Sequence, residues 1–449
     1  MNNNQEYYPK PVSLESTKKI CYQMIECVCK VYNPSGEFGT GFFMKIPCQN
    51  KTIPTLITSY HVLNEGYLNT ENEILIILEN DEKSIKLNNN KIIYTNEKLD
   101  ITIIEILEKD FIKNIHFLEL DEEITYRDYG TENIYMLQYN ERLGVSYGII
   151  KKSEDMKIIH TCYSEMGSAG SPILNSRTQR VIGIHIGRTK LYNHGILINY
   201  AIEDFIKFYI TNDIHFKEYK ESDFTNLKLL SAGSFCDVYS EQDNNEICLK
   251  KINIEKMNLI YQLNNLKDYQ KDINNEIYIL KLLSSNKNSV KYYGKYEKEK
   301  EKVIVMELCD QNLKEFMKKK NKALTDEEIK TKFLELNKLF KEMQKEKIIH
   351  IDLNLENFLV KYNKEKTDYT IKLCDYGAGK LKKNLNTIFS GVKGTIETIE
   401  PEIILGKEPK YENENVVDIF SLGIILYQLS HNLKHPFGEN PVNYILIYE

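Results

Sequence analysis

Short strand-like segments follow one another between residues 37 and 200, and they limit what the first half of this 449-residue chain can form. Segments such as "TLITSYHVL", "EILIIL" and "VIGIHIG" are rich in β-branched residues and are separated by turn signals. Many short strands in succession are typical of a closed antiparallel barrel or a sandwich. A helical stretch follows, and the polar residues 211–222 indicate a linker. Because strands and then helices come after it, we expect a multidomain chain whose second domain is α+β.

Composition excludes several classes of protein. The net charge of −6 gives no reason to expect a nucleic-acid partner. No apolar run is long enough to cross a membrane, and the first residues lack the apolar core of a secretion signal, so we expect no membrane partner. The nine cysteines are scattered and odd in number, which favours reduced thiols and a cytoplasmic protein.

Residues suited to phosphate chemistry occur in a fixed order in the second half. The stretch "LLSAGSFCDVYS" places small residues between two strand-like halves, as a loop over phosphates requires. Lys250 lies on the next strand, Glu276 on a helix, Asp352 and Asn357 in "HIDLNLEN", and Asp375 in "KLCDYG". Phosphoryl transfer needs a lysine at the nucleotide phosphates, a glutamate that holds it, two oxygen ligands for Mg²⁺, and a carboxylate that orients the acceptor hydroxyl.

This order of motifs resembles the eukaryotic-type protein kinase family over residues 223–449. The resemblance implies a bilobal fold, ATP and Mg²⁺ as cofactors, and transfer of the γ-phosphoryl group to Ser or Thr of a protein or peptide substrate. The residues that it assigns are Lys250, Glu276 and Asp352 as catalytic groups, Asn357 and Asp375 as metal ligands, and Ser231, Gly233, Val238, Lys250, Met306, Glu307 and Cys309 at the nucleotide.

Several positions depart from the kinase pattern. Ser231 and Cys236 replace glycines of the phosphate loop, Ile351 replaces the catalytic-loop arginine, and Asn354 replaces a lysine that contacts the γ-phosphate. Asp418 matches the helix aspartate that braces the catalytic loop. The sequence also stops before the family's last helices, so we expect a truncated C-lobe. These departures favour an alternative in which both halves are non-catalytic scaffolds.

Another set of residues, in the first half, has the order of a serine protease. His61 follows a strand in "LITSYHVL", Asp100 precedes one in "KLDITIIEI", and "MGSAGSP" comes last. A serine protease uses a base, a carboxylate that orients the base, and a nucleophile beside backbone N–H donors. The pattern over residues 15–210 resembles the trypsin-like family, and within it the glutamyl endopeptidases and the HtrA-like group. The resemblance implies an all-β double barrel with an oxyanion hole at Gly167 and Ala169.

Ala169 stands where the trypsin-like family has its nucleophilic serine. An alanine cannot form an acyl-enzyme, so we expect no protease activity. The resemblance to glutamyl endopeptidases places Ser164 and His185 in a pocket for an acidic side chain. We therefore expect a Ser/Thr protein kinase whose trypsin-like domain serves recognition or regulation. Two alternatives stay open: a serine endopeptidase, Glu-specific in one version, that an engineered Ser-to-Ala change has inactivated, and the non-catalytic scaffold.

Overall fold

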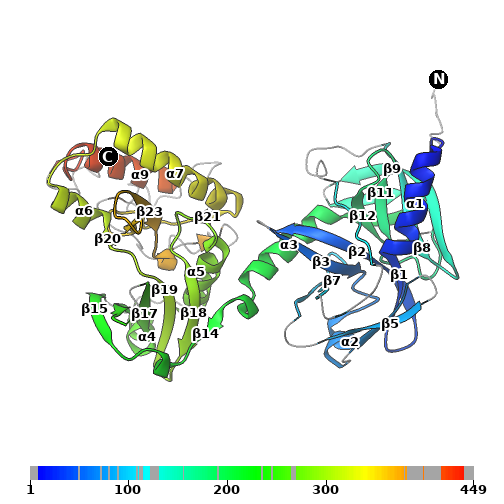
Figure 1. Ribbon diagram of the computed structural model, residues 1–449, viewed down its shortest axis with the longest axis horizontal. Helices are drawn as coiled ribbons and strands as arrows, with labels where there is room; N and C mark the ends of the chain where they lie inside the picture. The colour runs from blue at the N-terminus through cyan, green and yellow to red at the C-terminus, as the bar shows by residue number, and fades with distance from the viewer. Residues whose placement is uncertain are drawn as a thin grey trace. The chain divides into compact units, whose positions relative to one another are not determined.

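The chain folds into two compact units, residues 1–209 and 210–449. Both are seen in the computed structural model of Figure 1. Each unit has its own sheets and its own buried core, and the expected order of an all-β part followed by an α+β part is confirmed. The structure describes residues 9–48, 51–70, 73–78, 81–87, 91–107, 110, 115–121, 131–154, 156–189, 192–233, 236–243, 246–263, 269–378, 380–381, 398 and 416–438.

The first unit opens with helix α1 (Leu14–Cys27), where the Ser13 side chain accepts a hydrogen bond from a first-turn N–H group. A seven-stranded sheet follows, in the order β5-β4-β1-β2-β3-β7-β6. Exposed and buried residues alternate along β4, because successive side chains of a strand point to opposite faces. The elements are β1 (Val28–Tyr32), β2 (Phe38–Cys48), β3 (Lys51–Thr58), α2 (Glu65–Thr70), β4 (Glu73–Leu78), β5 (Asp81–Lys86), β6 (Ile93–Asn96) and β7 (Ile101–Glu105).

The remaining strands of the first unit form a closed barrel in the order β10-β13-β12-β11-β8-β9. The loop that holds "MGSAGSP" connects β10 to β11, and helix α3 (Ile198–Thr211) follows the last strand. The barrel strands are β8 (Asn133–Tyr139), β9 (Leu143–Glu154), β10 (Lys157–His160), β11 (Pro172–Asn175), β12 (Val181–Arg188) and β13 (Asn193–Leu197).

Gly170 lets the "MGSAGSP" loop lie directly against the seven-stranded sheet. Its φ is +87°, and a Cβ atom there would clash with the carbonyl oxygen of Thr40 on β2 and the side chain of Thr58 at the end of β3. The Thr40 N–H donates to the carbonyl oxygen of Ala169 at 2.8 Å. Ala169 is therefore held beside the end of β3, from which the chain continues to His61.

The second unit combines a six-stranded sheet, in the order β14-β18-β19-β17-β16-β15, with a helical part. Helix α5 lies beside the sheet, and α7 and α9 lie together in the helical part (Figure 1). The sheet region holds β14 (Lys217–Glu218), β15 (Leu227–Ala232), β16 (Cys236–Glu241), β17 (Ile247–Asn253), α4 (Ile254–Leu263), α5 (Tyr269–Leu283), β18 (Tyr292–Glu297) and β19 (Glu301–Glu307). The helical part holds β20 (Gln311–Asn312), α6 (Leu313–Lys320), α7 (Asp326–Lys345), β21 (Ile348–Ile349), β22 (Phe358–Tyr362), β23 (Tyr369–Leu373), β24 (Lys380–Leu381) and α9 (Val416–Ser430).

Local sequence explains where α7 begins. Thr325 accepts a hydrogen bond from the N–H of Glu328, and the Glu328 side chain accepts one from the N–H of Thr325. This reciprocal capping box satisfies donors that the first helical turn leaves unpaired. Among the residues that the structure describes, no helix, α7 included, is both long and apolar enough to cross a membrane.

Residues 211–222, which the sequence suggests as a linker, fold onto the second unit. They contain the short helix η2 (Asp213–His215) and strand β14, which pairs in parallel with β18. Lys281 of α5 donates to the carbonyl oxygen of Thr211 at 3.1 Å and forms an ion pair with Asp213. The polar composition of the segment thus reflects specific pairing with α5 and β18 rather than a free connection.

Candidate functional site

Lys250 on β17 lies between two carboxylates. Its Nζ is 2.6 Å from Oε1 of Glu276 on α5 and 2.8 Å from Oδ1 of Asp375, which follows β23. The lysine and the glutamate are buried, whereas the side chain of Asp375 is 46% exposed. The structure thus brings together three residues that are far apart in sequence. One carboxylate supports the lysine from inside, and the other faces solvent, where a metal-bound phosphate can approach.

The three charges set one another's protonation. Burial lowers the pKa of Lys250, but Asp375 and Glu276 outweigh it and raise that pKa well above its ordinary value. The charge of Lys250 holds the pKa of Asp375 below its ordinary value. Burial raises the pKa of Glu276, although the lysine opposes that shift. At neutral pH the site therefore presents a cationic lysine beside an anionic Asp375.

The loop between β21 and β22 arranges polar side chains around Asp352. The side-chain amide of Asn357 donates to the carbonyl oxygen of Asp352 at 2.8 Å and to its Oδ2 at 3.2 Å. Asn354 donates from Nδ2 to Oδ1 of Asp352 at 3.2 Å, and its own Oδ1 accepts the N–H groups of Glu356 and Asn357. The sequence presents Asn354 only as a missing lysine, whereas in the structure it organises the loop around the aspartate.

Asn357 and Asp375 fit a magnesium site by the chemistry of their donors. The carbonyl oxygen of Asn357 accepts the N–H of Cys374 at 3.0 Å, so the two candidate ligands belong to adjacent segments. Mg²⁺ prefers oxygen donors and usually takes one or two from the protein, with phosphate and water supplying the others. An amide oxygen and an ionised carboxylate meet that requirement.

Strand β16, which follows the phosphate loop, pairs with the strand that carries Lys250. Val238 on β16 lies directly opposite Lys250 on β17. The N–H of Gly233 donates to the carbonyl oxygen of Cys236 at 2.8 Å, which closes the loop after Ser231, a residue of β15. A backbone hydrogen bond therefore joins the described ends of the loop, although two of its glycine positions carry side chains.

The residues expected at the adenine base lie at the end of β19 and directly after it. Met306 and Glu307 are buried at the end of the strand, and Cys309 is half-buried two residues further on. The thiol of Cys248 on β17 lies 3.4 Å from the carbonyl oxygen of Glu307, to which it donates. This stretch is the connection to β20 and so joins the sheet to the helical part.

Ile351, next to Asp352, adopts a backbone conformation that β-branched residues avoid, with a φ of 71°. The Asp418 carboxylate on α9 accepts the N–H of His350 at 2.8 Å and the N–H of Ile351 at 2.9 Å. The ring of His350 in turn contacts the carbonyl oxygen of Cys374 at 3.0 Å. Asp418 and His350 therefore fix the loop that carries Asp352 against the segment that carries Asp375.

In the first unit, Asp100 orients His61 through three contacts. Nδ1 of His61 lies 2.8 Å from Oδ2 and 3.0 Å from Oδ1 of Asp100, and Oδ1 also accepts the N–H of His61. The side-chain hydrogen bond to Asp100 raises the pKa of His61. This is the orientation of base and carboxylate that a serine protease requires.

The loop at Ala169 is the predicted place of the oxyanion hole. Gly167 has a φ of +91°, and its carbonyl oxygen accepts a hydrogen bond from Oγ1 of Thr40 at 2.8 Å. Within the described residues, no partner takes the N–H of Gly167 or that of Ala169. Both donors are therefore available for the oxyanion hole that the sequence predicts, although position 169 has no hydroxyl.

Ser164 and His185 belong to a polar cluster that the sequence only partly shows. The hydroxyl of Ser164 donates to Oδ1 of Asn193 on β13, the strand between β10 and β12. Nδ1 of His185 is 3.1 Å from Nε2 of His160, and Arg188 donates to the carbonyl oxygen of Ser164 at 3.0 Å. Burial lowers the pKa of His160 to about 3 and that of His185 to about 4, so both rings are neutral. We did not expect His160 or Arg188 here; the strand-like "MKIIHTC" gives the only sequence signal for the former.

Comparison with protein families agrees with both the kinase-like and the protease-like sets of residues. Residues 39–184 match the family described as trypsin-like peptidase domain, and residues 224–446 match the family described as protein kinase domain. The chain therefore carries a trypsin-like peptidase domain followed by a protein kinase domain.

The kinase domain is similar to curated serine/threonine-protein kinases. Human serine/threonine-protein kinase Nek5 is 26% identical over 226 residues, which cover 49% of this chain and 29% of Nek5. Serine/threonine-protein kinase tousled-like 2 from Xenopus tropicalis is 28% identical over 225 residues, or 48% of this chain and 32% of that protein. The corresponding match to mouse tousled-like 1 is 27% identical and covers 29% of it. The chain thus spans about a third of the length of each relative.

Proposed function

We propose that the second unit transfers the γ-phosphoryl group of ATP, with Mg²⁺, to a Ser or Thr hydroxyl of a protein. The observation that carries this proposal is the simultaneous contact of Lys250 with Glu276 and Asp375. A lysine paired with the helix glutamate and lying beside the metal-ligand aspartate is the arrangement that phosphoryl transfer requires. The similarity of this half to serine/threonine-protein kinases supports the same class of acceptor.

The residues of the chain have distinct roles in this proposal. Lys250 neutralises the nucleotide phosphates, and Glu276 holds the ammonium group in place. Asn357 and Asp375 hold Mg²⁺, which supplies charge neutralisation at the transferring group. Asp352 accepts the proton of the substrate hydroxyl as its oxygen bonds to the γ-phosphorus, while the bond from that phosphorus to the β,γ-bridging oxygen breaks and ADP leaves. Asn354 and Asn357 hold the Asp352 carboxylate in position. Most of the catalysis is positioning and electrostatic stabilisation, so the loop geometry matters more than any covalent step.

The direct test is phosphoryl transfer by the full chain. We expect binding of Mg-ATP and labelling of a general protein substrate or of the chain itself with [γ-³²P]ATP. Asp352→Asn should abolish labelling while ATP still binds, and Asp326→Asn, an exposed carboxylate at the start of α7, should change neither. Binding without labelling by the unchanged chain would contradict the kinase proposal and favour the scaffold.

For the first unit we propose recognition of a peptide with an acidic side chain, through which the domain selects substrates or regulates the kinase. The observation that favours it is the polar cluster of Ser164, His185, His160, Asn193 and Arg188. Hydroxyl, imidazole and guanidinium groups can all donate hydrogen bonds to a carboxylate. The absence of a hydroxyl at position 169 leaves binding intact while preventing turnover.

A peptide array tests this second proposal. The full chain should retain peptides that contain Glu over matched peptides that contain Gln, and Arg188→Met should reduce that preference. Equal retention of both sets would remove the argument for an acidic ligand.

A further inference from the structure

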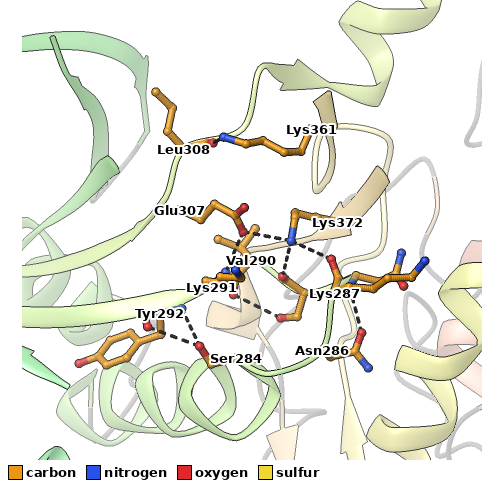
Figure 2. Close-up of polar contacts among 12 residues, drawn as sticks. Ser284, Asn286, Lys287, Val290, Lys291, Tyr292, Glu307, Leu308, Lys361 and Lys372 are labelled. Carbon is orange, nitrogen blue, oxygen red and sulfur yellow. Dashed lines mark hydrogen bonds and ion pairs between the residues drawn. The ribbon is translucent and has the colours of Figure 1, made fainter. Parts of the chain in front are cut away.

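Two lysines of the β22–β23 hairpin reach the stretch that is expected to bind the adenine base. Lys372 on β23 contacts the side chain of Glu307, and Lys361 on β22 contacts the backbone of Leu308 (Figure 2). Lys372 is the first residue of "KLCDYG" and Lys361 lies outside the quoted motifs, but the motif order assigns no role to either lysine. Both contacts join the helical part of the unit to the end of β19.

The ammonium group of Lys372 is fully satisfied in a buried position. Its Nζ lies 3.0 Å from Oε2 of Glu307 and donates to the carbonyl oxygens of Lys287 at 2.7 Å and Ser289 at 3.3 Å (Figure 2). Only 7% of the lysine side chain and 10% of the glutamate side chain are exposed. Because taking both charges out of water is costly, such a pair adds little net stability, and its fixed geometry is its main effect.

Lys361 fixes the orientation of a peptide group. Its Nζ lies 2.5 Å from the carbonyl oxygen of Leu308. That carbonyl and the N–H of Cys309 belong to one planar trans peptide, in which the two groups point in opposite directions. Holding the Leu308 carbonyl therefore aims the Cys309 N–H, which is the expected donor to the base.

The neighbouring peptide is held in the same way by the backbone. The N–H of Leu308 donates to the carbonyl oxygen of Glu246 at 2.8 Å. It shares a peptide plane with the carbonyl of Glu307, which is the expected acceptor from the base. Both polar groups of Leu308 are thus paired within the protein, and each fixes a peptide that carries a group expected at the base.

The same hairpin also carries the candidate metal ligands. Asn357 directly precedes β22, and Asp375 follows β23 by two residues. Leu359 on β22 and Lys372 on β23 are paired in register, so the hairpin acts as one piece. A single hairpin therefore links the place of the base to the place of the metal.

We propose that Lys361 and Lys372 are positioning residues for the nucleotide base. Lys361 orients the Cys309 N–H, and Lys372 sets the distance between the base-binding stretch and the segment that ends in Asp375. This inference rests on the proposed use of ATP. It adds that the base affinity of this chain depends on two lysines that do not touch the nucleotide.

The test separates base binding from phosphate binding. Affinities of the full chain are measured for Mg-ATP and for the magnesium complex of ribose 5-triphosphate, which lacks the base. Lys361→Met should weaken Mg-ATP binding about tenfold, as expected for a lost hydrogen bond to a charged donor, and leave ribose triphosphate binding unchanged. KM for ATP should rise while kcat at saturating ATP stays within about twofold.

Lys372→Met alone would leave the Glu307 charge buried, so it is made together with Glu307→Gln. The same selective loss of Mg-ATP affinity is expected. Lys332→Met is the matched control, because Lys332 also joins a carboxylate, Asp368, and a backbone carbonyl, that of Tyr369, at the far end of the hairpin. It should alter neither affinity.

The outcomes distinguish failure of the positioning role of the lysines from failure of the proposed kinase function. Unchanged Mg-ATP affinity in both lysine variants, or a parallel loss of both ligands, would overturn the positioning role. If the unchanged chain binds ribose triphosphate as tightly as ATP, the base site itself is wrong. If it binds neither, the proposed kinase function fails, whatever the lysines do.

Discussion

The strained conformation of Ile351 leads to a prediction about Asp418. A left-handed conformation costs an L-residue about 1–2 kcal/mol, and more when the side chain is β-branched. Asp418 accepts two buried N–H groups, and hydrogen bonds to a charged group contribute about 1.5–3 kcal/mol each. The two bonds together thus contribute about 3–6 kcal/mol, which exceeds the strain and holds the loop that carries Asp352.

Asp418→Ala should therefore free the loop. Losing about 3 kcal/mol of protection corresponds to roughly a hundredfold faster amide exchange at His350 and Ile351. Hydrogen–deuterium exchange measured by mass spectrometry reports this locally, without assuming that a two-unit chain unfolds in one step. The rate of phosphoryl transfer should also fall, because Asp352 is the next residue after Ile351 in the loop that Asp418 holds.

A double-mutant cycle tests the reasoning itself. Ile351→Gly removes both the side chain and the strain, whereas Ile351→Ala removes most of the side chain but keeps a residue that disfavours positive φ. In the Ile351→Gly background, Asp418→Ala should reduce the protection against exchange by about 1–2 kcal/mol less than it does in the unchanged chain. In the Ile351→Ala background, this difference from the unchanged chain should be smaller. Costs equal within about 0.5 kcal/mol in all three backgrounds would refute the argument that Asp418 balances backbone strain.

Three further predictions concern the first unit. Ala169→Ser should give a chain that reacts with a fluorophosphonate probe. The labelling rate should rise as the pH passes through the raised pKa of His61, because only the neutral ring accepts a proton. No labelling at any pH would contradict the prediction that His61 and the loop at position 169 form a protease-like site. Because the folded-state pKa values of His160 and His185 are depressed, the unfolded chain binds more protons below about pH 6.5. Thermal unfolding of the first unit should therefore occur at lower temperature as the pH falls from about 6.5 towards 4, and a double His→Gln variant should lose this dependence. Gly170→Ala should destabilise the first unit by more than about 2 kcal/mol, measured by chemical denaturation, because a Cβ atom there clashes with backbone and has a disfavoured φ.

The sequence predicts the parts of the fold whose signals are local. Alternating strands, the capping box at Thr325 and the motif order are readable because each depends on a few neighbouring residues. Residues 211–222 show the limit. Their polar composition is typical of a linker, yet β14 pairs with β18, and Lys281 holds Asp213. Those partners lie about seventy residues further on, and no local pattern connects them.

The same limit applies to the candidate site. The spacing of motifs identifies Lys250, Glu276 and Asp375 as candidates, and the fold brings them into contact. Lys361 lies outside these motifs, and Lys372 opens "KLCDYG" without a role that the spacing assigns to it. A lysine on a strand usually faces solvent, so neither residue is singled out as a candidate. Their roles depend on which backbone groups the hairpin meets after folding, which is a tertiary property.

The two domains depart from their families in different ways. The kinase domain differs at positions that shape the backbone, and the peptidase domain differs at the position of the nucleophilic side chain. In the kinase domain, Ser231 and Cys236 replace glycines, and Ile351 replaces an arginine. Backbone hydrogen bonds are nevertheless present at these places: the N–H of Gly233 donates to the carbonyl oxygen of Cys236, and Asp418 accepts the N–H of Ile351. The lysine, the glutamate and the carboxylates that the proposed phosphoryl transfer uses are present, although Asn354 replaces a lysine. In the peptidase domain the reverse is expected, because Asp100 orients His61 while position 169, where the family resemblance places the nucleophile, has no hydroxyl. A lost backbone preference can be compensated by neighbouring hydrogen bonds, whereas a missing nucleophilic oxygen cannot. We therefore propose catalysis for the kinase domain and binding for the peptidase domain.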